Sequence, residues 1–205
     1  MMKSYIISMA LALILITILN ICLNKGTDSI KEKIKWQHYF FGYLFILYLM
    51  IALKDVVGFP SISDFQGALK VNKPIFNPII NFIPFSNGIE ISAILNIIFF
   101  MPFGFLLPVL WQKFRRFLPI LCAGVVFSLI IEIGQLFTHR ASDIDDLIMN
   151  VLGAILGWII FMVMSKIFYK LSNKTAAEPS ATDSIILKLE PYIYIVIAIM
   201  STFLS

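Results

Sequence analysis

The chain is a series of long apolar runs separated by short segments that hold most of its charged residues. About 20 consecutive apolar residues in a helix cross a bilayer, so each run predicts one membrane-spanning helix. The predicted spans cover residues 4–23, 36–57, 91–111, 117–137 and 144–169. A shorter run over 190–205 has only 14 residues after Pro191, so it either crosses as a sixth span or lies in the interface. The expected fold class is therefore an all-α, polytopic transmembrane helical bundle of five or six spans.

Composition supports this class of protein. The chain is 60% hydrophobic and 14% charged, with a mean hydropathy of +0.91, which lies outside the usage of soluble globular domains. We divide it into an N-terminal membrane helix with a basic cytoplasmic loop (1–35), a membrane domain (36–170), and a polar linker with a C-terminal hydrophobic helix (171–205).

The distribution of lysine and arginine predicts the orientation in the membrane. Short cytoplasmic loops carry an excess of these residues. Eleven of them follow the first, third and fifth predicted spans, and five lie on the opposite side together with the N-terminus. This asymmetry predicts an N-terminus outside the cell membrane. The basic residues are spread over juxtamembrane loops, which suits a lipid bilayer with anionic headgroups and argues against a nucleic-acid partner. Protein partners cannot be inferred from the sequence.

The segment 58–90 is a long predicted outer loop of unusual composition. It contains four prolines among many Phe and Ile residues. Such a segment is too apolar for a solvated loop and too interrupted by proline for a straight helix. We expect an interfacial or re-entrant segment that caps the bundle.

Polar residues concentrate at the turn between the fourth and fifth spans. Ser128, Glu132, Gln135 and His139 share one stripe of the fourth span, and Asp143, Asp146 and Asn150 share one stripe of the fifth. The connecting turn is short, so the two helices should be antiparallel neighbours whose polar stripes face each other. Gly153 and Gly157 continue the second stripe as a small-xxx-small pair that allows a close helix partner. The stripes predict a shallow, outward-facing polar pocket between spans four and five, roofed by 58–90.

A purely structural interpretation is also open. Asp143 could cap the helix that follows it, Arg140 could contact headgroups, and Glu132 could hold two helices together by hydrogen bonds. Asn96 in the third span either lines the pocket or makes a helix–helix hydrogen bond. An ionisable residue inside a membrane span, however, is a functional-site hypothesis by default.

Four sequence motifs resemble the VanZ-like family. They are NFIPF (81–85), NIIFFMPFGFLLP (96–108), SLIIEIGQLF (128–137) and HRASDIDDLIMNVLGAILG (139–157). The resemblance covers roughly residues 40–168, and the polar positions of the family pattern fall on the residues named above. This family is named for an accessory protein of glycopeptide resistance in Gram-positive bacteria, associated with teicoplanin. The resemblance implies a multi-pass protein of the cell envelope, located in the bacterial cytoplasmic membrane. It implies a resistance phenotype but no particular chemical reaction.

Three kinds of function fit these residues. The first is a binding protein for an amphiphile such as a lipoglycopeptide or a cell-wall precursor. Its candidate ligand-binding residues are Gln135, Arg140, Asp143, Asn150, Asn96 and Ser128. The second is a membrane-embedded enzyme with Glu132 and Asp146 as paired catalytic carboxylates. The third is a structural or partner-assembling protein with the polar turn as its latch. No cofactor is expected; the oxygen ligands would suit a divalent cation, but their spacing matches no known metal motif.

Overall fold

The structure is a computed structural model that describes residues 2–26, 35–76, 79–81, 83–85, 88, 91–138, 141–177 and 185–205. Five long apolar helices are candidate membrane spans. They are α1 (Met2–Gly26), α2 (Trp36–Ile51) with its π-helical extension η1 (Ala52–Val56), α4 (Ile91–Leu110), α5 (Phe117–Gln135) and α6 (Ile144–Ile167). The expected class, an all-α helical membrane bundle, is confirmed, and each predicted span coincides with one of these helices.

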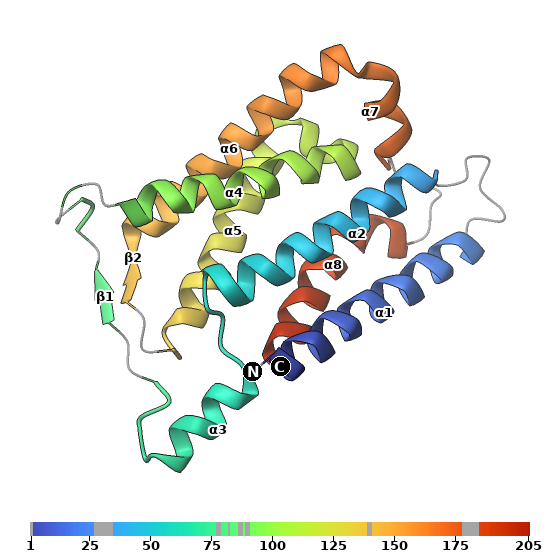
Figure 1. Ribbon diagram of the computed structural model, residues 1–205. Helices are drawn as coiled ribbons and strands as arrows, with labels where there is room; N and C mark the ends of the chain where they lie inside the picture. Colours follow the sequence, from blue (N-terminus) through green and yellow to red (C-terminus); the bar gives the residue numbers. More distant parts are fainter. Residues whose placement is uncertain are drawn as a thin grey trace.

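The remaining elements lie at the two ends of the bundle (Figure 1). The short helix α3 (Ile62–Lys70) and the strands β1 (Ile79–Asn81) and β2 (Ala141–Asp143) lie at the same end as both chain termini. The 3₁₀ turn η2 (Gln112–Arg115) and the short helix α7 (Tyr169–Thr175) follow the other ends of α4 and α6. The helix ends are therefore sorted onto two faces, as alternating membrane crossings require.

The C-terminal helix is longer than the sequence indicated. α8 runs from Ile185 to Phe203, so Pro191 lies inside it and not at its start. The apolar residues before Pro191 extend the helix, and proline is tolerated because a bundle environment can satisfy the freed carbonyl group. α8 packs against α1 and α2, and its Tyr194 and Ala198 side chains are fully buried. This burial makes α8 a member of the bundle rather than a surface helix.

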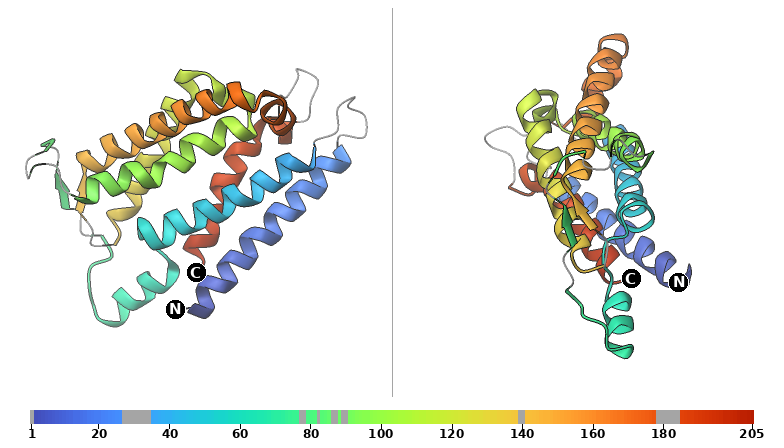
Figure 2. Two further views of the ribbon diagram at one scale, coloured as in Figure 1. Left: turned by 45° about the horizontal axis from the view of Figure 1, so that its top comes forward. Right: turned by 90° about the vertical axis from the view of Figure 1, so that its left-hand side faces the viewer.

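The closest helix pair is α4 with α6, which run side by side in the same direction (Figures 1 and 2). A side chain on Gly153 would overlap the carbonyl oxygen of Ile97, and one on Gly157 would overlap that of Met101. Gly104 on α4 faces the backbone of Ala154 in the same way. The small-residue stripe of α6 therefore meets α4, which places residues 153–157 of α6 directly beside residues 97–104 of α4.

The segment 58–90 contains two ordered elements. α3 begins with a capping box formed by Ser61 and Asp64, has no buried residue and projects away from the bundle (Figure 1). β1 pairs in parallel with β2, which leads directly into α6. The Nδ2 group of Asn81 also donates to Asp143 at 3.2 Å. The segment is thereby tied to the start of α6.

Candidate functional site

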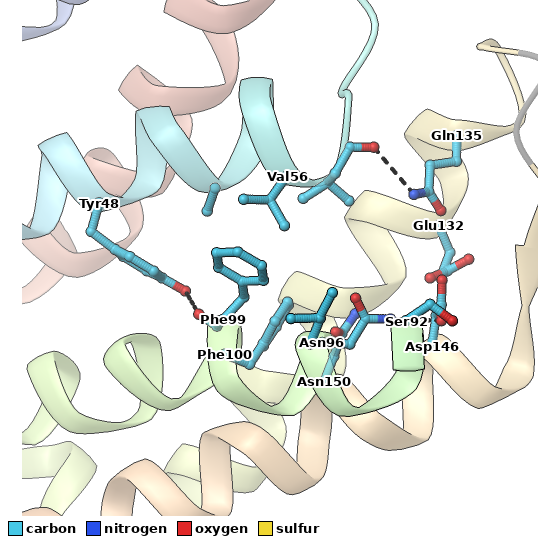
Figure 3. A pocket seen from close by; sticks show the side chains of 13 residues that line it. Tyr48, Val56, Ser92, Asn96, Phe99, Phe100, Glu132, Gln135, Asp146 and Asn150 are labelled. Atoms are coloured by element: carbon cyan, nitrogen blue, oxygen red, sulfur yellow. Dashed lines mark hydrogen bonds between the residues drawn. The ribbon is translucent and has the colours of Figure 1, made fainter. Parts of the chain in front are cut away.

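A cavity of about 370 Å³ lies among α2–η1, α4, α5 and α6, in the half of the bundle nearest to β1 and β2. Figure 3 shows that its polar side chains gather at one end and that Tyr48, Phe99 and Phe100 form the other. The polar lining residues are Ser92, Asn96, Glu132, Gln135, Asp146 and Asn150. We refer to this space as the acceptor cavity, for the oxygen atoms that line it.

One wall of the acceptor cavity comes from the last turns of α5. Glu132 and Gln135 are three residues apart, so they share one face of the helix, and only 6% and 5% of their surfaces are exposed. The Nε2 group of Gln135 donates to the carbonyl oxygen of Val57 at 3.3 Å, which fixes the orientation of the amide. Its Oε1 atom is buried and accepts no hydrogen bond from the described residues. The Oε1 atom of Gln135 can therefore accept a hydrogen bond from a donor group of a ligand.

A second wall comes from the first turns of α6 and the facing turns of α4. Asn96 Nδ2 donates to Asp146 Oδ1 at 2.6 Å, joining the two closely packed helices. Asn150 Nδ2 donates to Ser128 Oγ at 3.0 Å, joining α6 to α5. Ser128 is fully buried and lies outside the cavity lining, so it supports Asn150 and does not face the cavity. Asn96 therefore has both roles considered for it: it makes the helix–helix hydrogen bond, and it also lines the cavity.

Two acidic residues at the start of α6 have local partners instead. The Asp143 carboxylate accepts from the backbone N–H of Asp145 at 3.0 Å as the N-cap of α6, and it also accepts from Asn81. Asp145 accepts from the backbone N–H of Phe85 at 2.9 Å. Neither residue lines the acceptor cavity. His139 and Arg140 lie outside the described residues.

No sequence pattern marks the wall formed by α2 and η1. Tyr48, Ala52, Val56 and Val57 line the cavity from this side, and the Tyr48 hydroxyl donates to the carbonyl oxygen of Phe99 at 2.8 Å. The segment 36–57 that contains them has the composition of an ordinary apolar span, and a π-helical turn has no reliable sequence pattern. None of the described residues of 58–90 belongs to the cavity lining, so the roof over this pocket stays a prediction.

A second buried polar cluster, unexpected from the sequence, lies at the opposite end of α2. Glu190 of α8 accepts from His38 Nε2 at 2.9 Å and from Trp111 Nε1 at 2.8 Å. His38 Nδ1 lies 3.0 Å from the carbonyl oxygen of Thr175, which can only accept, so this nitrogen carries a hydrogen. All four residues are at most 1% exposed. We call this the closed cluster.

The charge of the acceptor cavity restricts what it can hold. In the described part of the chain, its lining contains two carboxylates, Glu132 and Asp146, and no lysine, arginine or histidine. Among the described residues, no group of three or more His, Cys, Asp or Glu side chains is arranged to hold a metal ion. The oxygens of this cavity are therefore suited to N–H or O–H donors of a ligand, or to proton transfer between the two acids.

Comparison with known proteins agrees with the motifs. A family model described as VanZ/LLP1 matches residues 41–169. The curated Protein VanZ of Enterococcus faecium is 38% identical over 89 residues, which are 42% of this chain and 55% of that protein. The match thus spans about half the length of this relative, and no solved structure matches the chain. Because the family model covers more than half of the sequence, as the four motifs indicated, this chain belongs to the VanZ/LLP1 family.

Proposed function

We propose that this protein binds an amphiphile whose polar part is rich in hydrogen-bond donors, and that the acceptor cavity is its site. The observation that carries this proposal is the buried Oε1 atom of Gln135, fixed by the bond from Nε2 to Val57. A buried acceptor without a donor costs about 1–3 kcal/mol. A ligand hydroxyl, amide N–H or ammonium group would remove that cost.

The neighbouring carboxylates favour the same ligand chemistry. Glu132 and Asp146 line the cavity beside Gln135. Bonds in which one partner is ionised are roughly twice as strong as neutral ones, so a donor would gain most from these two groups.

The apolar end of the cavity supports an amphiphile over a small polar solute. Tyr48, Phe99 and Phe100 line that end, and the side chain of Phe99 is 37% exposed. In a bilayer this surface would lie against lipid chains, so an acyl chain could remain in the membrane while its polar part entered the cavity.

The cavity would open toward the outer leaflet of the bacterial cytoplasmic membrane. Its lining comes from the C-terminal halves of α2 and α5 and the N-terminal halves of α4 and α6. The lysine and arginine asymmetry assigns these helix ends, with the N-terminus, to the outer side. A ligand arriving from outside the cell would therefore meet this half of the bundle first.

The name of the Enterococcus relative suggests which amphiphile is involved. A lipoglycopeptide such as teicoplanin combines an acyl chain with sugar hydroxyls and amide N–H groups, which could donate to the acceptor oxygens of the cavity. We therefore propose a link to teicoplanin resistance in a Gram-positive host, with a wall precursor as the other amphiphile of matching chemistry.

A second candidate function rests on the same two acids. Glu132 and Asp146 line one cavity from α5 and α6, and two neighbouring carboxyl groups can share a proton and act as general acid and base. In that case the bound amphiphile, or a lipid-linked substrate, would be chemically altered.

Growth inhibition by teicoplanin, with vancomycin as the control without an acyl chain, tests the proposal. A susceptible Gram-positive host would carry the wild type, Glu132→Gln or Asp146→Asn at equal membrane abundance. We expect the wild type to protect against teicoplanin more than vancomycin, and both variants to lose protection. Recovery of unmodified teicoplanin from protected cultures would favour binding, and a modified product would favour the enzyme. Protection that survives both substitutions would refute the assigned site and leave the latch interpretation.

A further inference from the structure

A second cavity lies on the other side of η1 and carries the opposite charge. It measures about 640 Å³ and is bounded by η1, α3 and the end of α5. Two lysines line it, Lys54 and Lys73, together with the hydroxyl groups of Ser61, Ser63 and Thr138. We call it the lysine cavity. Successive residues of η1 separate the two spaces, because Ala52 and Val56 face the acceptor cavity while Lys54 faces this one.

Neither lysine of the lysine cavity belongs to an ion pair among the described residues. Lys54 donates to the hydroxyl of Ser205, a neutral partner, and no described carboxylate forms an ion pair with it. Asp64 also lines the cavity, but its Oδ2 atom accepts from the backbone N–H and the hydroxyl of Ser61 at 2.9 and 2.6 Å. The cavity therefore has two ammonium groups against one carboxylate already engaged.

An apolar groove of about 410 Å³ adjoins the lysine cavity between α5 and α8. Its lining includes Ile130, Ile133 and Phe203, and none of its described residues has an ionisable side chain. Ile133 is 57% exposed, so this surface faces the lipid when α5 spans a membrane. Chains of neighbouring lipids could enter the groove without crossing any polar surface.

Three phenylalanines form the common wall of the lysine cavity and the groove. Phe59, Phe65 and Phe137 line both, and Phe65 packs edge-on against Phe137 and Phe203 with ring centroids 6.3 and 5.8 Å apart. A cationic, hydroxyl-lined space thus adjoins an apolar channel. An anionic phospholipid has the same arrangement, a phosphate beside an acyl chain.

We infer that this composite surface is a binding site for one anionic phospholipid, with its phosphate at Lys54 and Lys73 and an acyl chain in the groove of α5 and α8. The phosphate can accept hydrogen bonds from both ammonium groups. This site is separate from the acceptor cavity and does not depend on the proposed function. A lipid bound there would pack against η1, which forms a wall of both cavities.

Native mass spectrometry of the purified full chain, titrated with phosphatidylglycerol or phosphatidylcholine, tests the inference. We expect phosphatidylglycerol to bind more tightly and the double variant Lys54→Gln/Lys73→Gln to weaken it about tenfold, since each basic group near the surface contributes to attraction of anionic lipid. Lys70→Gln is the matched control, because Lys70 is exposed on α3 and does not line the lysine cavity. Ile133→Trp should block the groove, whereas Leu129→Trp, on the same helix but outside the groove lining, should not.

The outcomes separate this site from the proposed function. Glu132→Gln should leave phosphatidylglycerol binding unchanged even if it abolishes protection against teicoplanin. If the double variant fails to fold, Lys73→Gln alone serves, because Lys73 is exposed and its loss should weaken binding severalfold. Equal binding of both lipids, or equal losses with Lys70→Gln and Lys73→Gln, would overturn the inference and indicate general contact with bulk lipid.

Discussion

The acceptor cavity and the closed cluster are both built around a buried glutamate, and they lie at opposite ends of α2. In the closed cluster, the two oxygens of Glu190 receive hydrogen bonds from His38 and Trp111, and the residue is 0% exposed. In the acceptor cavity, Glu132 faces a space of about 370 Å³ beside the buried acceptor of Gln135. A buried carboxylate alone is therefore no sign of a ligand site in this bundle. Two features distinguish the candidate site from a structural ion pair. One is the open space of the cavity, and the other is the buried Oε1 atom of Gln135, which accepts no hydrogen bond from the described residues.

The largest effect is expected at the closed cluster. Glu190→Ala would leave the His38 and Trp111 N–H groups buried without their acceptor and would release α8 from α2. Breaking a buried pair from one side costs about 3–5 kcal/mol. Thermal unfolding of the purified protein in detergent, followed by far-UV circular dichroism, should show a much lower midpoint than for the wild type. Any loss of protection against teicoplanin should follow membrane abundance, and an unchanged midpoint would mean that the cluster does not stabilise the bundle.

The smallest effect on stability is expected at Gln135. In Gln135→Leu, the bond to Val57 is lost, but the buried acceptor without a donor is removed as well, so stability should change by less than about 1 kcal/mol. Ligand affinity should fall about 3- to 10-fold through loss of one neutral hydrogen bond. The same unfolding assay and a teicoplanin titration measure both effects. A strongly destabilised variant, or one with full affinity, would show that Gln135 has a structural role.

Much of the fold could be predicted because the bilayer sets the length of each apolar run. The predicted span 117–137 and the observed helix Phe117–Gln135 differ by two residues at one end. The spacing of Gly153 and Gly157 also predicted a close helix contact, but not its partner. Small residues permit approach by any neighbour, and α4 is the helix that they meet.

The candidate site could be predicted only where its polar residues share a helix face. Glu132, Gln135, Asp146 and Asn150 follow helical spacing on adjacent spans, and all four line the acceptor cavity. The wall from Tyr48 to Val57 is apolar and resembles lipid-facing sequence, so no local pattern marks it. The closed cluster was equally hidden, because His38 and Glu190 are 152 residues apart and no local spacing connects them.

Direct binding of teicoplanin to the purified protein in lipid nanodiscs tests the central claim, that the acceptor cavity holds the ligand. Wild type, Glu132→Gln and Asp146→Asn would be titrated with teicoplanin and with vancomycin. Each variant loses one charged acceptor, worth about 1.5–3 kcal/mol, so affinity should fall about 10- to 100-fold. Saturable binding by the wild type that both variants weaken, with vancomycin binding poorly, is the predicted result. Equal teicoplanin binding by all three proteins, at equal thermal stability, would contradict the account.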